Sequence, residues 1–190
     1  MEEKKEMKVD GNIERFYQYS FPMQAVLVTC HDDEHNKTNV ITVAWHTPIS
    51  VDPPLYGISI APKRYSHSII EKSKEFVINF VPYHLVDKTH FCGTHSGRTV
   101  NKIKETELTL LSARRVKTPL IKECYAHLEC KLFQSLKIGD HTFFVGQILS
   151  VEVDKELFKN DLLKIDKIQP LYYIGGNKYT TIDKTKKREF

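Results

Sequence analysis

The fold is decided by the segment 39–54, which reads Asn39-Val40-Ile41-Thr42-Val43-Ala44-Trp45-His46-Thr47-Pro48-Ile49-Ser50-Val51-Asp52-Pro53-Pro54. It begins as an apolar, β-branched run of strand length and ends in two prolines, which cannot continue the hydrogen-bond ladder of a sheet. In a strand over 39–45, the period of two places Asn39, Ile41, Val43 and Trp45 on one face and Val40, Thr42 and Ala44 on the other. Small side chains beside one large aromatic ring leave room for a planar ligand, although an ordinary core strand shows the same pattern.

The segments around it predict further strands. Residues 22–30 are expected to pair with 39–45 across an exposed turn at 31–37, and the strands 55–61 and 75–81 are each stopped by a proline. The later strands are expected at 124–133, at 141–153 after a turn at 138–140, and at 170–179, and helical segments are expected at 85–91 and 155–163. Many short strands and few helices predict a mainly β protein, a closed or nearly closed antiparallel barrel.

The 190 residues contain no internal repeat and no low-complexity linker, so a single domain over 1–190 is expected, with a peripheral lead-in at 1–20 and a basic tail at 184–190. No apolar run is long enough to span a bilayer, and the charged start has no apolar region of a signal peptide, so we expect no membrane partner and a cytoplasmic location. The net charge of +4 owes much to the tail. A nucleic-acid-binding barrel is the alternative from another class, but the other basic residues are scattered among acidic ones, so no nucleic-acid partner is expected.

A short helix is expected after Pro62. Ser68-x-x-Glu71 matches a capping box, which would open the helix just beyond Arg64 and Ser66. Free backbone amides, the positive end of the helix dipole, an arginine and the hydroxyls of Ser66 and Ser68 together form a plausible phosphate site. The same Ser-x-x-Glu pattern is also common at helix starts that bind nothing.

The cysteines and histidines do not indicate a metal site. His90-x-Cys92-x-x-His95 offers three ligands, but no Cys-x-x-Cys pair accompanies it, and strand parity turns Cys124 and Cys130 into the core. Cys92 beside two histidines could be a nucleophile, yet the sequence supplies no orienting third partner. No metal is therefore expected, and no catalytic residue is assigned.

Further short motifs lie in order along the chain: Arg64-Tyr65-Ser66, Phe76-Val77-Ile78-Asn79, Cys92-Gly93, Ser96-Gly97-Arg98, Lys102, Pro119-Leu120-Ile121, Gly139-Asp140-His141, Val145-Gly146, Pro170-Leu171-x-Tyr173 and Gly175-Gly176. Together with the segment 39–54 they span nearly the whole chain. In these motifs the sequence resembles the flavin reductase-like family of FMN-binding split barrels, and within it the flavoredoxin-type branch. The resemblance implies a Greek-key antiparallel split barrel with FMN as its cofactor.

The resemblance also implies roles for individual residues. Asn39 and the neighbouring backbone of Val40 and Ile41 would hydrogen-bond the flavin, with Thr42 assisting, and Trp45 would lie against the ring system. Ser66 would hold the phosphate or ribityl chain, with Arg64 and Ser68 as its neighbours. Finally, the resemblance assigns a positive charge near the flavin to Lys102, contact with the cofactor to His141, and packing on the ring to Tyr172 or Tyr173, between which strand parity does not decide.

The function implied is that of an FMN-binding oxidoreductase, which takes hydride or electrons from NAD(P)H or a protein donor and passes them to an acceptor. The alternative is a flavoredoxin-type electron-transfer protein, which docks a redox partner protein and has no NAD(P)H turnover of its own. In either case the resemblance implies a homodimer with FMN near the subunit interface.

Overall fold

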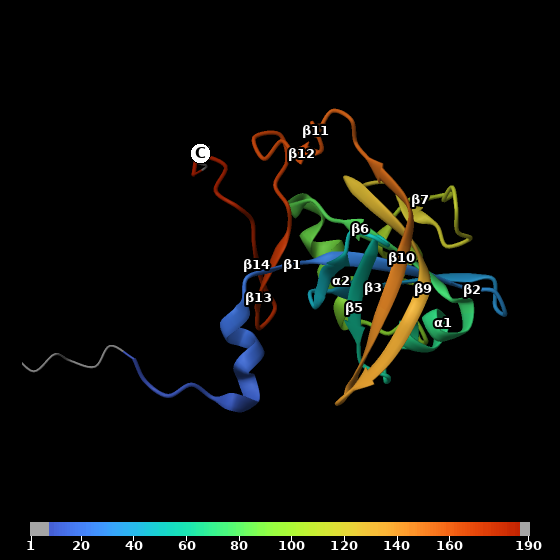
Figure 1. The fold of residues 1–190 in the computed structure, drawn as a ribbon, viewed down its shortest axis with the longest axis horizontal. Coiled ribbons are helices and arrows are strands. Elements are labelled where there is room, and N and C mark those ends of the chain that lie inside the picture. Colours follow the sequence, from blue (N-terminus) through green and yellow to red (C-terminus); the bar gives the residue numbers. More distant parts are fainter. Residues whose placement is uncertain (1–7, 187–190) are drawn as a thin grey trace, which may run out of the picture.

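The computed structural model describes residues 8–186, and strands make up most of its regular structure (Figure 1). The helices are η1 (Ile13–Ser20), α1 (Tyr65–Ser73), η2 (Tyr83–Leu85), α2 (Val86–Thr94) and α3 (Lys102–Thr106). The strands are β1 (Met23–Gln24), β2 (Val26–Asp32), β3 (Lys37–Val43), β4 (His46–Ser50), β5 (Leu55–Ile60), β6 (Glu75–Phe80), β7 (Leu110–Leu111), β8 (Leu120–Ile121), β9 (Ala126–Ile138), β10 (His141–Val153), β11 (Phe158–Lys159), β12 (Leu162–Leu163), β13 (Tyr172–Gly175) and β14 (Lys178–Thr180). No helix in this part of the chain has the length and apolar character that crossing a membrane requires.

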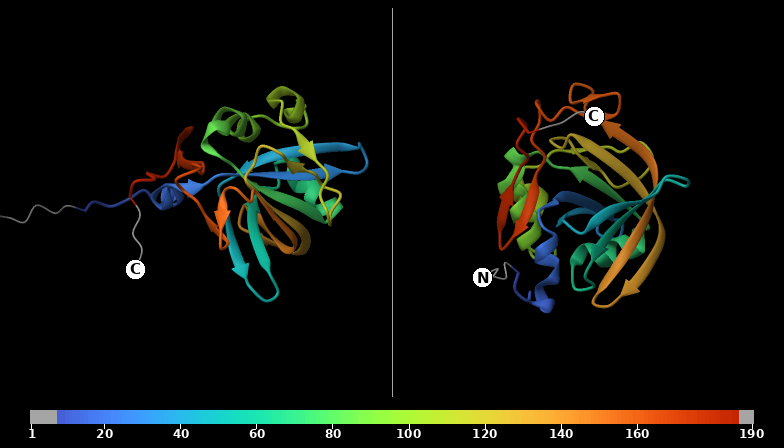
Figure 2. Two further views of the ribbon diagram at one scale, coloured as in Figure 1. Left: turned by 90° about the horizontal axis from the view of Figure 1, so that it is seen from above. Right: turned by 60° about the vertical axis from the view of Figure 1, so that its left-hand side comes forward.

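Seven strands form one strongly curved antiparallel sheet in the order β3-β2-β6-β9-β10-β5-β4 (Figure 2). Its two edge strands, β3 and β4, are consecutive in sequence and are joined only by Ala44 and Trp45. The backbone N–H of Ser59 in β5 donates to the carbonyl of Trp45 at 2.9 Å, which continues the β4–β5 ladder up to this link. The sheet is therefore nearly closed at the link, whereas the outer edge of β3 stays open. This architecture confirms the expected mainly β, split-barrel class.

Two apolar clusters cover the two faces of the sheet. The inner face contributes Val28, Ile41 and Phe76 to a cluster that helix α1 joins through Ile69 and Ile70. The outer face contributes Leu27 and Val40 to a second cluster, which Ile121 of β8 and Leu85 and Cys92 of the α2 region complete. Because both faces of β3 are covered in this way, its open edge is the part of the strand that can meet a ligand.

A small separate sheet, β1-β13-β14, stands beside the barrel. It is tied to the barrel by His46, whose Nε2–H donates to the carbonyl of Gln24 at 2.8 Å, while the hydroxyl of Tyr56 lies 2.7 Å from Nδ1. Burial lowers the pKa of His46 below its ordinary value, since the charged imidazolium is poorly solvated there. The neutral imidazole is thus the form that joins the two sheets.

His46 should make the stability depend on pH. Because its pKa is lower in the folded state than in the unfolded one, the unfolded chain binds more protons in the window below about pH 6.5, and the free energy of unfolding falls as the pH falls through that window. Urea unfolding at pH 7.5 and 5.5 measures how much of the free energy of unfolding is lost on acidification. This loss should be smaller for His46→Gln than for the wild type. The exposed His84→Gln variant serves as the control and should lose as much as the wild type. Equal losses in all three proteins would exclude this role.

Several local predictions were wrong. The strand expected over 39–45 ends at Val43, and Ala44 and Trp45 form the link to β4. Helix α1 begins at Tyr65, three residues before the expected cap, and Ser68 lies inside it with its hydroxyl donating to the carbonyl of Tyr65. The segment 155–163 is a two-stranded hairpin, β11–β12, because its turn residues Asn160 and Asp161 adopt left-handed backbone angles. Cys124 and Cys130 are both buried, as expected, but Cys124 lies before β9 and packs in the outer cluster, whereas Cys130 packs in the inner one.

Candidate functional site

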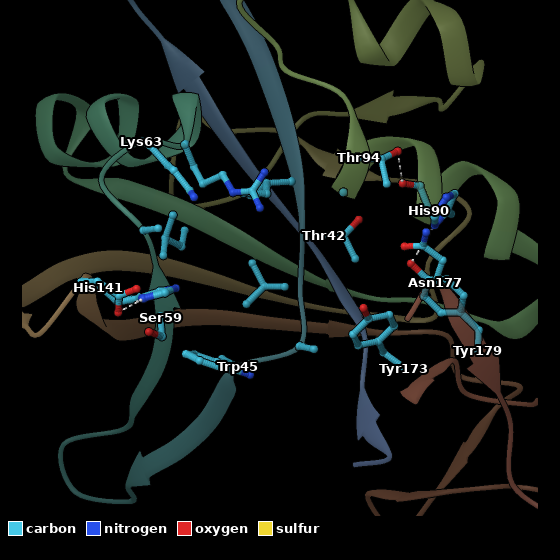
Figure 3. A pocket seen from close by; sticks show the side chains of 18 residues that line it. Thr42, Trp45, Ser59, Lys63, His90, Thr94, His141, Tyr173, Asn177 and Tyr179 are labelled. Atoms are coloured by element: carbon cyan, nitrogen blue, oxygen red, sulfur yellow. Dashed lines mark hydrogen bonds and ion pairs between the residues drawn. The ribbon is translucent and has the colours of Figure 1, made fainter. Parts of the chain in front are cut away.

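A two-part cleft runs along the open edge of β3, and Figure 3 shows the side chains that line its wide compartment. Its wide compartment, about 580 Å³, is lined by residues 41–45, the end of β5, and side chains from α2, the β9–β10 turn and the β13–β14 hairpin. Its narrow compartment, about 210 Å³, lies toward the start of α1. The residues that line both are Ile41, Lys63, Arg64, Gly93 and Thr94. One elongated ligand could therefore occupy both compartments.

The backbone of β3 supplies polar groups to this cleft. Nζ of Lys102 donates to the carbonyl of Val40 at 2.8 Å, so this carbonyl points away from the neighbouring strand β2. Alternate residues of a strand direct their N–H and C=O groups to the same edge. Thr42, which lines the wide compartment, therefore directs its backbone N–H and C=O to the open edge. Such an edge can hydrogen-bond the polar side of a planar ring.

One end of the wide compartment is formed by Trp45, His141 and Asp140. The indole and imidazole rings lie 5.0 Å apart between centroids, tilted by 36°. Oδ1 of Asp140 lies 2.7 Å from Nδ1 of His141, and this hydrogen bond lowers the pKa of the Asp140 carboxyl. The carboxylate fixes Nδ1 as a donor, which leaves Nε2 of the ring for another partner.

The opposite end is formed by Tyr173, Asn177 and Tyr179 of the β13–β14 hairpin, together with His90 of α2 (Figure 3). The hydroxyl of Tyr179 lies 3.3 Å from Nδ1 of His90. Burial raises the pKa of Tyr179 to about 12, so this hydroxyl remains protonated at neutral pH. This end therefore presents the protonated hydroxyl of Tyr179, the amide of Asn177 and the aromatic rings of both tyrosines.

The narrow compartment is rich in groups that bind anions. Three cationic side chains line it, from Lys63, Arg64 and Lys102, together with the hydroxyls of Ser66, Thr94 and Ser96. It lies at the N-terminal end of α1, where the first backbone N–H groups have no partner within the helix and the helix dipole is positive. No carboxylate of residues 8–186 lines this compartment. The donor set fits a phosphate or a similar anion.

Lys102 is a buried lysine at the junction of strand and helix. Its Nζ donates to the carbonyls of Val40 and Cys92, at 2.8 and 2.6 Å, and only 5% of the residue is exposed. Burial lowers the pKa of Lys102 to about 8, an effect that Cys92 and Cys30 partly offset. An ammonium group has three donors, so one N–H remains for a ligand in the narrow compartment.

Gly97 fixes Asn39 against the same compartment. A Cβ atom on Gly97 would overlap Oδ1 of Asn39, so only glycine fits in this place. Nδ2 of Asn39 donates to the hydroxyl of Ser66 at 2.7 Å. Because Ser66 accepts this hydrogen bond, its own O–H is available to donate to a ligand.

Most of the residues predicted from the sequence lie around this cleft. The wide compartment is lined by Thr42, Trp45, His141 and Tyr173, the narrow one by Asn39, Ser66 and Lys102, and both by Ile41 and Arg64. Two predicted side chains lie elsewhere: Ser68 bonds within α1, and Tyr172 lies on β13 opposite Gln24, without lining either compartment. Val40 was predicted to contribute its backbone; its side chain is in the outer apolar cluster, and its carbonyl accepts from Lys102 at the open edge.

The lining residues that were not predicted come mainly from loops and from the ends of elements. They are Val43, Ala44, Ser59, Ile60, Ala61, Lys63, Tyr65, His90, Gly93, Thr94, His95, Ser96, Gly97, Asp140, Asn177 and Tyr179. Some of them could have been found from the sequence, because Gly93, Ser96, Gly97 and Asp140 lie in the motifs Cys92-Gly93, Ser96-Gly97-Arg98 and Gly139-Asp140-His141. Asn177 and Tyr179 carry no such signal, since only the tertiary fold brings their hairpin to β3.

Cys92 and the two histidines of His90-x-Cys92-x-x-His95 do not face one another, and each lies in a different environment. Cys92 is buried, and burial raises its thiol pKa to about 11, which disfavours the thiolate that a metal or a substrate would need. The ring of His95 stacks on Phe91 at 3.9 Å, while His90 faces Tyr179. In the described part of the chain, the side chains grouped closely enough to share a metal ion are Asp32, Glu34 and His35, on the β2–β3 turn.

Comparisons with known proteins agree with this geometry. A sequence model of the flavin reductase-like domain matches residues 18–182. An uncharacterised protein of Archaeoglobus fulgidus is 36% identical over 164 residues, which cover 86% of this chain and 90% of that protein.

Two solved structures extend the comparison. An FMN-binding protein from Thermus thermophilus, crystallised with 1-cyclohex-2-enone, has a TM-score of 0.80 and 28% identity, covering 97% of this chain and 99% of its own. Flavoredoxin from Methanosarcina acetivorans has a TM-score of 0.80 and 27% identity, covering 94% of this chain and 92% of its own. The similarity in fold thus extends over nearly the whole chain.

Proposed function

Because the chain belongs to the flavin reductase-like family, we propose that it binds FMN in the two-part cleft and acts as an NAD(P)H-dependent flavin oxidoreductase. One observation carries the proposal. The wide compartment is bounded by a strand edge and aromatic rings, and it continues directly into a narrow compartment lined by cations and hydroxyls. This is the chemistry that a planar ring with a phosphate at the end of a short chain requires.

The residues present fit FMN at both ends. Lys63, Arg64 and Ser66 would hold the phosphate beside the start of α1, with Lys102 supplying a further charged donor. The backbone of Thr42 would bind the polar edge of the isoalloxazine ring. Of the two predicted tyrosines, the lining of the wide compartment supports Tyr173 as the one that covers the ring.

A second ligand, the nicotinamide donor, could bind at one side of the wide compartment, which is lined by Lys63, Asp140 and His141. When bound, FMN would accept a hydride from a reduced nicotinamide and pass the electrons to an acceptor. Lys63 and Asp140 are exposed, so this side is open to solvent. Asp140 orients the imidazole of His141, whose Nε2 can hold a proton or accept a hydrogen bond at this entrance.

The first test is the absorption spectrum of the purified protein, followed by release and mass identification of the cofactor. Bands near ~375 and ~450 nm with the mass of FMN are expected. Oxidation of NADH and of NADPH is then followed with FMN in excess, and rapid turnover with at least one of them supports the enzyme. A colourless protein that takes up no added FMN would contradict the proposal.

A specific observation also favours the flavoredoxin-type alternative. The side chains of Ile13, Phe16 and Tyr19 on η1 are 84%, 65% and 67% exposed, and this short helix contacts Trp45 of the cleft through Tyr17. A redox protein docking there would reach the FMN site from that side. Bound FMN that dithionite reduces, together with negligible oxidation of NADH and NADPH, would select this alternative.

The homodimer stays a proposal, and exposed apolar side chains near the end of β10 support it. Leu149, Val151 and Val153 are 39%, 56% and 42% exposed and together form an apolar stripe. A two-fold dimer could bury the stripes of both copies. The cytoplasmic location inferred from the sequence likewise stays a prediction.

Val151→Asp should convert a dimer into a monomer. A carboxylate in the centre of the stripe would have to lose its water on association, at a cost of several kcal/mol. Light scattering coupled to size exclusion should give a mass near 44 kDa for the wild type, twice the 22.1 kDa of the chain, and near 22.1 kDa for the variant. Ser112→Asp, which adds the same charge at another exposed position, should remain dimeric. A dimeric Val151→Asp protein would place the interface elsewhere.

A further inference from the structure

A continuous series of aromatic rings connects the two ends of the wide compartment. It passes through the N-terminal segment, which is η1 and the following Phe21. The series is His141, Trp45, Tyr17, Phe21, Tyr173, Tyr179 and His90, with successive centroid distances of 5.0, 5.7, 6.2, 5.3, 5.2 and 5.8 Å. The two outer pairs and Tyr173 line the cleft. Tyr17 and Phe21, in the middle, do not line it, yet they connect its two ends.

Helix η1 is attached to the body through these two rings. Within η1, which the structure describes in full, no residue is buried, and Tyr17 is the one that is partly buried. Its ring meets Trp45 edge-on at an interplanar angle of 64°, and Phe21 meets Tyr173 at 69°. Figure 2 shows η1 beside the β13–β14 hairpin, outside the barrel.

The two cleft rings lie outside the strands of the barrel sheet. Trp45 stands on the two-residue link between β3 and β4, outside any strand, and Tyr173 stands on a hairpin that does not belong to the barrel sheet. In Figure 3 both rings lie along the same border of the cleft, Trp45 toward His141 and Tyr173 toward Tyr179. Edge-to-face contacts restrict the tilt of both partners.

We propose that Tyr17 and Phe21 are positioning residues, which hold Trp45 and Tyr173 in the orientations that let a planar ligand enter the wide compartment. The N-terminal segment is then a working part of the binding site, although it does not line the cleft. The proposal rests on the proposed function only in taking FMN as the ligand. The orientation of Trp45 can be tested without any ligand.

The chain contains a single tryptophan, so its fluorescence reports on Trp45 alone when the tyrosines are not excited. We expect Tyr17→Leu to shift the emission of the ligand-free protein to longer wavelength and to increase its quenching by acrylamide. Tyr17→Phe retains the ring and should behave as the wild type. Tyr19→Leu is the matched control, because it removes the same kind of ring two residues away, where the side chain is 67% exposed.

FMN titrations complete the test. Tyr17→Leu and Phe21→Leu should each weaken FMN binding roughly five- to tenfold, the loss expected when one aromatic contact around the ligand is no longer held. Phe21→Leu should do so with a smaller effect on Trp45 emission, because its ring contacts Tyr173. The thermal midpoints of both variants should stay close to that of the wild type, since Tyr17 and Phe21 are only partly buried.

The outcomes separate the two proposals. If the wild type fails to bind FMN, the proposed function fails, while the emission shift of ligand-free Tyr17→Leu still decides the positioning role of Tyr17. Wild-type emission and wild-type FMN affinity in Tyr17→Leu would overturn the positioning role. A large fall in its thermal midpoint would also overturn it, because Tyr17 would then be a structural core residue.

Discussion

Replacement of Lys102 by methionine is expected to weaken FMN binding about 100-fold, the loss of a charge-assisted hydrogen bond to an anionic ligand group. Methionine has nearly the same length and keeps the apolar contacts of the stem. It cannot donate to the carbonyls of Val40 and Cys92, which lie 2.8 and 2.6 Å from Nζ in the wild type. The free energy of unfolding should therefore also fall by about 2 kcal/mol, because buried carbonyls lose their donor.

Lys104→Met is the matched control for this experiment. Lys104 is on the same helix, α3, two residues away, but it is exposed. Its replacement should change neither FMN affinity nor the urea midpoint appreciably. If the Lys102→Met protein bound FMN as tightly as the control, the assignment of Lys102 to the ligand site would be wrong.

The lowered pKa of Lys102 adds a prediction about pH. Since this pKa is about 8 in the ligand-free protein, the ammonium loses its proton as the pH rises through that value, and FMN affinity should fall. The stability of the ligand-free protein should change in the opposite direction. Between pH 8 and the ordinary lysine value of 10.5 the unfolded chain binds more protons, so folding is favoured as pH rises. Both trends should be weaker in Lys102→Met.

Gly97→Ala is expected to have the second largest effect, a loss of FMN affinity of about 30-fold and of about 1–3 kcal/mol in stability, as overpacking in a tight site typically costs. The new methyl group would overlap Oδ1 of Asn39 and push this side chain away from Ser66. The narrow compartment would then lose its Asn39–Ser66 hydrogen bond. FMN titration and urea unfolding measure the two losses.

A double variant distinguishes this clash from a general disturbance of the loop. Gly97→Ala combined with Asn39→Ala removes the atom that the methyl group meets, so stability should recover most of its loss. FMN affinity should stay low, because the amide that orients Ser66 is absent. Additive losses in the double variant would show that the two residues do not interact in this way.

The sequence predicts the strands of this protein better than its helices. The strand 141–153 has the predicted bounds, because its alternation is regular and a Gly-Asp turn marks its start. Strand β3 begins at Lys37, two residues earlier than expected, since the hairpin ladder continues into polar residues that resemble a turn. The start of helix α1 was predicted too late, because Ser68 and Glu71 match a capping box. The same two residues also occur inside helices, and local sequence alone does not distinguish the two cases.

The cleft was predictable where one segment supplies its lining. Asn39, Ile41, Thr42 and Trp45 were assigned from one segment by the resemblance to the family, and all four line the cleft, three from β3 and Trp45 from the link after it. Residues such as Tyr179 were missed because strand periodicity describes one element at a time. Their distance from β3 depends on how a separate small sheet docks on the barrel, and the contacts of His46 and Tyr17 that fix this docking join residues far apart in the sequence.

The open edge of β3 also bears on the fate of the newly made chain. An unpaired strand edge, apolar on both faces, is a template on which strands of other chains can add, and it is a common start of aggregation. The opposite edge of the sheet is protected by Pro48 and by its two-residue junction with β3. A ligand that hydrogen-bonds along β3 would protect the remaining edge. Flavin supply would then govern how much of this protein accumulates in a cell, through solubility as well as through activity.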